Sequence, residues 1–256
     1  MNFVANIGAA TLAYLAKIGH IFSFIGTAVM HCFAPPFYPR LIFKQIIQIG
    51  YFSLPVVGLT AIFSGAVLAL QSYSGFSRFN AESTIATVVV LSITRELGPV
   101  LAGLMVAGRV GASMAAEIGT MRVSEQIDAL TTLSTNPFKY LVAPRIIAAV
   151  LMLPLLVLIA DIIGVMGGYL VSVYELGFSS GPYLRSTFEF LEVMDVISGL
   201  TKAAFFGFII ASMGCYWGYH SKGGAEGVGT ATTNAVVSSS ISILLINYII
   251  TGWFFS

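Results

Sequence analysis

Five long apolar stretches make up most of this 256-residue chain. Each holds the roughly 20 residues that a helix needs to cross the hydrocarbon core of a bilayer, which is about 30 Å thick. Charged residues are 9% of the chain, whereas soluble domains carry about 25%. The sequence therefore predicts an all-α membrane protein, and the five expected spans cover roughly residues 46–72, 84–110, 146–173, 195–218 and 231–255.

The segment before these stretches differs from them. Residues 3–33 are apolar but interspersed with Gly, Ser, Thr, Lys17 and His20, and three prolines follow at positions 35, 36 and 39. We expect an amphipathic helix lying in the membrane interface, because a sixth span would place both termini on one side. No cation precedes Lys17, so the segment lacks the basic start of a signal peptide. The predicted organisation is an interfacial region at 1–45 and a five-span domain at 46–256.

The distribution of Lys and Arg predicts the orientation, because translocated loops are depleted in these residues. With a cytoplasmic amino terminus, the inner side holds Lys17, Arg40, Lys44, Arg109, Arg122, Lys139, Arg145 and Lys222. The outer side then holds Arg78 and Arg185, together with the acidic Glu175, Glu189, Glu192 and Asp195. We therefore expect a cytoplasmic amino terminus and a periplasmic or extracellular carboxyl terminus.

Composition and spacing exclude several function classes. The net charge is +1 with no basic block, which argues against nucleic acid binding. The cysteines, Cys32 and Cys215, and the three histidines match no metal-binding spacing, so a zinc or redox enzyme is not expected. We expect both cysteines to be free thiols.

Two adjacent charges, Arg95 and Glu96, lie within the second expected span. Neighbouring helix residues point about 100° apart, so each charge needs a partner on another helix or a wet cavity. Pro99 has no amide proton and leaves the carbonyl of residue 95 without its helical partner. Two interpretations stay open: a packing ion pair with Lys202 or Asp161, or a transport path.

A stripe of small residues follows, at a constant spacing of four. Such a stripe lets two helix backbones approach closely, either between two copies of the chain or within one. Its members are Gly103, Ala107, Gly111, Ala115 and Gly119.

The longest polar region comes next, at residues 115–140, and it overlaps a cytoplasmic helix that we expect at about 114–133. Ser124 can cap a short helix that carries Glu125 in its first turn and places Ile127 and Leu130 on one face. This amphipathic helix would suit docking to a soluble partner, and an ordinary solvated loop helix is the alternative.

A glycine cluster, SKGGAEGVGTATTNAVV, joins the last two expected spans. It lacks the Lys-Ser/Thr pair of a phosphate-binding loop and follows no strand, so we do not expect nucleotide binding. We expect a tight turn, with Thr230 or a nearby threonine starting the last helix.

Three runs of sequence resemble the MlaE/YrbE permeases of the MCE-linked ABC lipid transporters. They are RELGPVLAGLMVAGRVGASMAAEIGTMRVSEQIDAL at 95–130, NPFKYLVAPRIIA at 136–148 and AEGVGTATTNAVV at 225–237. The similarity extends from about residue 40 onward.

The resemblance implies a permease of the bacterial inner membrane that works as a homodimer. It implies two ATPase subunits and a STAS-domain subunit on the cytoplasmic side, and a hexamer of MCE-domain subunits on the periplasmic side. Such a system moves phospholipid between the inner and outer membranes and maintains outer-membrane lipid asymmetry. ATP and Mg would belong to the ATPase, so this chain would be a non-catalytic subunit with no cofactor of its own.

The resemblance also implies roles for individual residues. Arg95 and Glu96 match an intramembrane pair beside a lipid cavity, Lys202 matches a cation of the fourth span, and Asn247 stands where some relatives have an acid. The residues that would line the cavity with apolar side chains are Leu68, Tyr73, Phe76 and Phe79. The residues that would couple the permease to the ATPase are Glu117, Arg122, Glu125 and Asp128.

Two other classes of protein are alternatives to the permease. An ion-coupled secondary transporter would use Glu96, Asp161 and Lys202 as a proton relay, but such transporters commonly show two related halves and no repeat is found. An intramembrane enzyme would need a nucleophile with a base, or a metal cluster, and neither pattern occurs in the sequence.

Overall fold

The computed structural model describes residues 3–79 and 84–255, and within them the chain forms helices and no strand. This confirms the predicted all-α class. The first half contains α1 (Phe3–Phe33), α2 (Pro39–Ile49), η1 (Tyr51–Ser53), α3 (Leu54–Phe76), η2 (Ser77–Phe79), α4 (Ile85–Ser92), η4 (Ile93–Leu97), α5 (Gly98–Val106), η5 (Ala107–Gly111) and α6 (Ala112–Val123). The second half contains α7 (Gln126–Thr132), η6 (Phe138–Val142), α8 (Ala143–Tyr174), α9 (Ser180–Phe190), α10 (Val193–Tyr219) and α11 (Gly224–Phe255).

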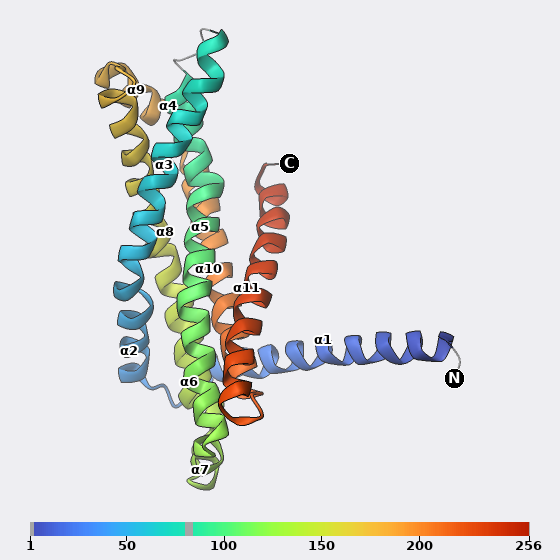
Figure 1. Ribbon diagram of the computed structural model, residues 1–256. Coiled ribbons are helices and arrows are strands. Elements are labelled where there is room, and N and C mark those ends of the chain that lie inside the picture. The colour runs from blue at the N-terminus through green and yellow to red at the C-terminus, as the bar shows by residue number, and fades with distance from the viewer. Residues whose placement is uncertain (1–2, 80–83, 256) are drawn as a thin grey trace.

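Several of these elements join end to end into long rods that run side by side (Figure 1). We call the end of the bundle where α7 lies the α7 end, and the opposite end, where α9 lies, the α9 end. Six helical stretches among the described residues are long and apolar enough to cross a membrane: Thr11–Phe33, Pro39–Phe76, Ile85–Val123, Phe138–Tyr174, Val193–Tyr219 and Gly224–Phe255. We call Pro39–Phe76 the first rod and Ile85–Val123 the second rod.

Five of these stretches contain the five expected spans, and all five are longer than expected. The Ile85–Val123 rod has 39 residues, about 58 Å at 1.5 Å per residue. The observed helices extend beyond the predicted apolar spans. Their ends carry polar and charged side chains, which are compatible with a helix but are not counted as part of an apolar stretch.

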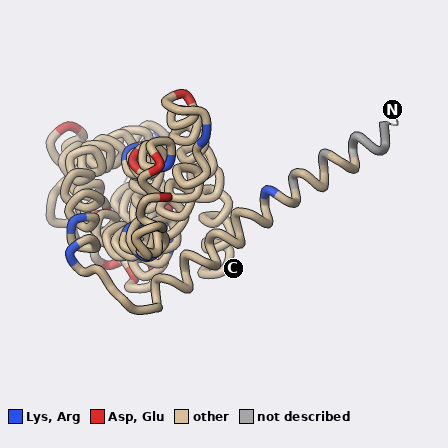
Figure 2. Tube along the Cα trace, turned by 90° about the horizontal axis from the view of Figure 1, so that it is seen from below, with Lys and Arg blue, Asp and Glu red and all other residues tan. Residues whose placement is uncertain are grey.

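The sixth stretch lies in α1, which sequence analysis assigned to the membrane interface. Figures 1 and 2 show α1 running transverse to the bundle and projecting away from it. Its later part packs on the bundle through Phe24, whose ring lies 5.1 Å from Phe138 and 5.5 Å from Tyr216. This arrangement fits a helix lying along the surface of a membrane that the other helices cross, and the interfacial location itself stays a prediction. Since α2 begins at Pro39, residues 39–45 are continuous with the first rod and not with α1.

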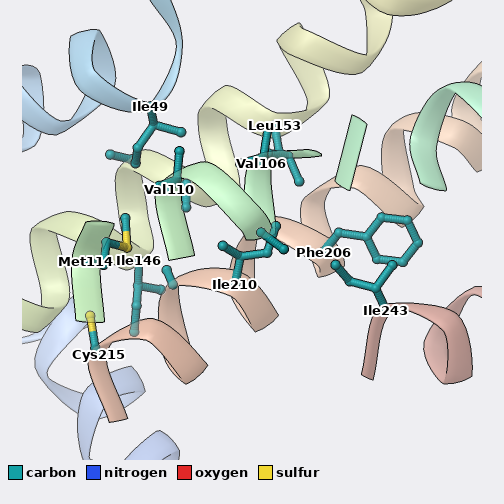
Figure 3. Packing of buried hydrophobic residues seen from close by; sticks show 14 of the residues in the cluster. Ile49, Val106, Val110, Met114, Ile146, Leu153, Phe206, Ile210, Cys215 and Ile243 are labelled. Carbon is teal, nitrogen blue, oxygen red and sulfur yellow. The ribbon is translucent and has the colours of Figure 1, made fainter. Parts of the chain in front are cut away.

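The core contains buried residues from all six of these helical stretches, and Figure 3 shows part of it. The central helix α8 packs against α3 and α10. Ile49, Leu153, Phe206 and Ile243 have no exposed surface, and Val106 is 1% exposed. Between membrane-crossing helices such contacts stabilise the bundle by close van der Waals packing, because lipid tails are as apolar as these side chains.

The stripe of small residues is a close-packing surface, as expected, and it is used within the chain. A Cβ on Gly103 would lie 3.1 Å from the ring of Phe206 on α10, and one on Gly111 would lie 3.4 Å from Ile210. The stripe therefore lets α10 pack closely against the same rod within one chain.

Large apolar side chains cover the outside of the rods. Phe63 on α3, Ile162 on α8 and Tyr248 on α11 are 65%, 63% and 82% exposed. Soluble monomers rarely expose continuous apolar surface on this scale, whereas lipid-facing helices do. The exposed faces and the lengths of the rods together describe a multi-pass membrane protein.

Two predicted helix starts are wrong. Ser124 does not cap α7; its hydroxyl donates to the carbonyl of Thr120 at the end of α6. Glu125 precedes α7 instead, with a left-handed φ of 60°. The last helix starts at Gly224 and not at Thr230, because Gly223 and Gly224, both with positive φ, complete the turn six residues earlier.

Candidate functional site

The carbonyl of Arg95, which was predicted to lack its helical hydrogen bond, accepts a hydrogen bond from a side chain of another helix. Around Pro99 the rod widens into the π-helical turn η4, and the N–H of Gly98 bonds to the carbonyl of Ile93. Lys202, from α10, donates its Nζ to the carbonyl of Arg95 at 2.7 Å. A side chain from another helix therefore replaces the hydrogen bond that proline removes.

The close approach of α10 depends on a glycine. A Cβ on Gly199 would lie 2.6 Å from the carbonyl oxygen of Thr94, a distance that real Cβ atoms do not show. Gly199 therefore lets the backbone of α10 touch η4, which brings Lys202, three residues later, within reach of the turn.

Glu96 is the centre of a polar cluster. Its Oε1 accepts from Lys202 Nζ at 2.8 Å and from Thr251 Oγ1 at 2.8 Å. Its Oε2 accepts from Asn247 Nδ2 at 2.8 Å. Because the donors come from α10 and α11, Glu96 ties both helices to the second rod.

Arg95 points to a different partner. Its Nε lies 2.7 Å from Oδ1 of Asp195, in the first turn of α10. The other Asp195 oxygen accepts the N–H of Glu192 at 3.1 Å and so caps the helix. The guanidinium also lies 4.5 Å from the ring centre of Phe255, a cation–π distance.

We call these six residues the charge cluster: Arg95, Glu96, Asp195, Lys202, Asn247 and Thr251. It contains two cations and two carboxylates, so its formal charge is zero with a neutral residue at position 247. Lys202 and Asp195 have no exposed surface, whereas the side chains of Glu96 and Arg95 are 37% and 34% exposed. The cluster is therefore buried on the α10 side and open on the other.

Asp161 is not part of this cluster, although sequence analysis considered it as a partner for the charged pair. It is 6% exposed, and its Oδ1 has no hydrogen-bond partner among the described residues. That oxygen lies against Gly98, where a Cβ would come within 1.8 Å of it. The interpretation of Asp161 as the ion-pair partner of Arg95 is wrong, because Asp195 fills that place. Lys202 pairs with Glu96, as considered.

The apolar residues expected to line a cavity lie at the α9 end of α3. Leu68, Tyr73 and Phe76 pack against a small cluster that includes Ile85 and Val89. This cluster contains none of the residues that surround Glu96, so the lining of a lipid cavity by these side chains stays a prediction. The side chain of Phe79 lies outside the described residues.

The residues expected to couple to an ATPase lie at or near the α7 end. Arg122 lies 2.7 Å from Asp128, an exposed pair that joins α6 to α7. Glu117, on α6, pairs at 2.7 Å with the buried Arg145 of α8. The expected coupling helix is thus the end of α6, a turn at Glu125, and α7.

Two residues of the charge cluster were missed by sequence analysis. Asp195 was assigned to the outer loop, although its spacing of three from Glu192 is a capping pattern and its spacing of seven from Lys202 places both on one helix face. Thr251 follows Asn247 by four residues, which also places both on one face. These two spacings could have placed Asp195 beside Lys202 and Thr251 beside Asn247.

Most of the chain matches known proteins. The family model described as Permease MlaE matches residues 42–253. A probable ABC transporter permease protein of Rickettsia bellii is 64% identical over 255 residues, which cover 100% of this chain and 98% of the relative. A probable ABC transporter permease of Synechocystis sp. is 41% identical, covering 91% of this chain and 89% of the relative. The chloroplastic protein TRIGALACTOSYLDIACYLGLYCEROL 1 of Arabidopsis thaliana is 37% identical, covering 90% and 66%.

Proposed function

Because the chain belongs to the MlaE permease family, we propose that this ABC transporter permease moves phospholipids between the inner and outer membranes and so maintains outer-membrane lipid asymmetry. The observation that carries the proposal is the half-open charge cluster beside apolar helix faces. A phospholipid needs polar partners for its head group and an apolar surface for its acyl chains.

The structure supplies both kinds of surface side by side. Glu96 and Arg95 are each about one-third exposed, and α11, which contributes Asn247 and Thr251, exposes Leu244 and Tyr248. A charge-balanced cluster suits a zwitterionic or singly charged head group, because it presents donors and acceptors without a large net field.

The relatives support a lipid as the substrate class. The name of the Arabidopsis relative contains the name of a galactolipid, trigalactosyldiacylglycerol. Relatives named as probable ABC transporter permeases disfavour the ion-coupled secondary transporter, whose relay also required Asp161 beside Glu96.

Permeases of ABC transporters depend on ATPase subunits, so this chain is proposed to act without catalytic chemistry or a cofactor of its own, with ATP and Mg bound by the partner. We assign the docking surface for the ATPase to the α7 end. The proposed assembly also contains a second copy of this chain, a STAS-domain subunit and a hexamer of MCE-domain subunits. A second copy facing α11 would close the open side of the charge cluster, which a single bundle leaves uncovered.

The proposed location is the inner membrane of a bacterium, with the α7 end in the cytoplasm. The α7 end carries the cations Arg122, Lys139 and Lys222, whereas the α9 end carries Arg78 and Arg185 beside the acidic Glu175 and Glu189. This distribution follows the rule that positive charge stays on the cytoplasmic side. The amino terminus would then be cytoplasmic and the carboxyl terminus periplasmic.

The test is purification of the chain with its associated subunits from native membranes, followed by mass spectrometry of the bound lipid and a transfer assay in vesicles. The proposal expects copurified phospholipid and ATP-dependent movement of labelled phospholipid between the permease vesicles and an acceptor membrane. A complex that hydrolyses ATP but moves no phospholipid would contradict it.

A further inference from the structure

A groove opens at the α7 end, between the end of α6 and the start of α11, which lie side by side there (Figure 1). Its volume is about 350 Å³, within the range of roughly 300–1,000 Å³ that is typical of ligand pockets. Residues of both helices and of the turn after α6 line it: Thr120, Val123, Ser124, Gly224, Ala225 and Val228.

Short and apolar side chains make this groove hollow. Val228 packs over Gly119 of α6, where a Cβ would lie 3.5 Å from both methyl groups of the valine. The hydroxyl of Ser124 already donates to the carbonyl of Thr120 at 2.7 Å. The groove therefore offers mainly methyl groups and short side chains, which suit a large apolar side chain better than a polar ligand.

The surface of α11 around the groove is polar. Its first turns expose Thr230, Thr233 and Asn234. The large exposed apolar side chains of α11 begin at Val237, nine residues after Val228 and so about 14 Å further along the helix. A surface of this kind faces water and not lipid, so the occupant of the groove belongs to a soluble protein.

Acidic side chains flank the groove on both sides. Glu125 and Glu226 each come directly after a lining residue, and both are exposed. Lys222, at the turn before α11, is exposed as well. Within residues 3–79 and 84–255 none of the three forms an ion pair. Two free acids and one free cation leave the rim acidic, which complements a basic segment of a partner.

We propose that this groove seats a large apolar side chain of the ATPase subunit, on a segment that also presents Lys or Arg to Glu125 and Glu226. The inference rests on the proposed docking of the ATPase at the α7 end and adds to α7 a second contact. The two contacts are continuous, because Ser124 of the lining precedes Glu125 and α7. An apolar anchor in a pocket with charges at its rim is typical of protein interfaces.

The groove shares two helices with the charge cluster. The second rod runs from α6 through η5 and α5 to Glu96, and α11 carries Asn247 and Thr251, which both bond to Glu96. A side chain seated between α6 and α11 therefore contacts both helices whose other ends meet at Glu96. The ATPase would thus hold the permease at the two helices that α11 and Glu96 join.

The direct test places a photo-crosslinking amino acid at position 225 in the intact complex and identifies the crosslinked peptide by mass spectrometry. The proposal expects a peptide of the ATPase subunit, crosslinked within a few residues of a Lys or Arg. The control is the same amino acid at position 230, which is exposed on α11 outside the groove and should not reach that peptide. Products formed only with a second copy of this chain, with another subunit or with lipid would overturn the proposal.

Two tryptophan variants test whether the groove contributes to binding. Ala225→Trp fills it from α11 and Thr120→Trp fills it from α6, whereas Thr230→Trp is the matched control. We expect the ATPase subunit to bind about tenfold more weakly in both groove variants, the loss of one anchor contact, with no change in the control. Unchanged melting temperatures would show that the variants fold. Normal ATPase binding by folded groove variants would overturn the proposal.

These results are separable from the outcome for the proposed function. If charge reversal at Glu125 and Asp128 releases the ATPase while the probe at position 225 never reaches it, the groove proposal fails and docking through α7 remains. If the probe reaches the ATPase but the complex moves no phospholipid, the proposed substrate fails and the groove contact remains.

Discussion

Lys202 donates its ammonium to the backbone carbonyl of Arg95 across 2.7 Å, and that carbonyl is the one that Pro99 leaves without its helical partner. The same ammonium lies 2.8 Å from Glu96. One buried ammonium therefore replaces the hydrogen bond that Pro99 removes and also neutralises the adjacent carboxylate. This relationship joins α10 to the turn that exposes Arg95 and Glu96.

We first predict that Lys202→Met destabilises the folded protein. The substitution leaves the Arg95 carbonyl unpaired and Glu96 without its cation, which costs about 3 kcal/mol, the low end for buried pairs because Glu96 is partly exposed. The measurement is the melting temperature in detergent, with Lys222→Met, at an exposed lysine, as the control. Adding Glu96→Gln to Lys202→Met should restore part of the loss. Independent, additive effects of the two substitutions would contradict the pairing.

The second prediction concerns the contact between Gly98 and Asp161. Gly98→Ala places a Cβ where Asp161 Oδ1 now lies, so we expect a loss of about 1–3 kcal/mol from overpacking. Gly108→Ala, on the same rod, meets no atom within 4 Å and should stabilise the helix by about 0.5–1 kcal/mol. Asp161→Ala should rescue part of the loss in Gly98→Ala, because the carbonyl oxygen of Ile93 would still lie 2.9 Å from the new Cβ. Equal melting temperatures for the two glycine variants would show that Gly98 does not contact Asp161.

The third prediction addresses the α7 end. Charge reversal at Glu125 and Asp128 should reduce the amount of ATPase subunit that copurifies with the permease, because charges at the rim of an interface orient docking. The fold should survive, since the Arg122–Asp128 pair is exposed and such pairs contribute at most about 1 kcal/mol. Glu189→Lys, on α9 at the other end of the bundle, is the control. Normal copurification of the doubly reversed variant would remove α7 from the docking surface.

Local chemistry explains which parts of the site were predictable from sequence. A proline deletes a donor wherever the helix runs, so the free carbonyl of Arg95 followed from Pro99 alone. Apolar stretches likewise located the five rods, because bilayer thickness constrains the length of any span. The need for partners around Arg95 and Glu96 followed from the cost of unpaired charge in a membrane.

The identity of those partners was harder to predict, because it depends on how α10 and α11 are aligned against the second rod. Arg95 pairs with Asp195 and not with the expected Asp161, because Gly199 allows the close approach of α10. Helix ends were also misjudged where glycines continue a helix or a left-handed residue interrupts it, as at Gly224 and Glu125. Such features are decided by tertiary packing, which overrides local propensity.

The most direct test of the central claim is the comparison of Glu96→Gln with the unmodified protein for bound phospholipid and for melting temperature. Glutamine keeps the size of the side chain and one acceptor oxygen for Lys202, whose ammonium also stays bonded to the carbonyl of Arg95. The site should therefore lose its charge with a smaller loss of stability than Lys202→Met causes. The account predicts a folded variant that retains little phospholipid in the charge cluster and transports poorly per folded molecule. A variant that folds poorly, yet carries normal phospholipid and normal transport per folded molecule, would show that Glu96 serves packing and would contradict the account.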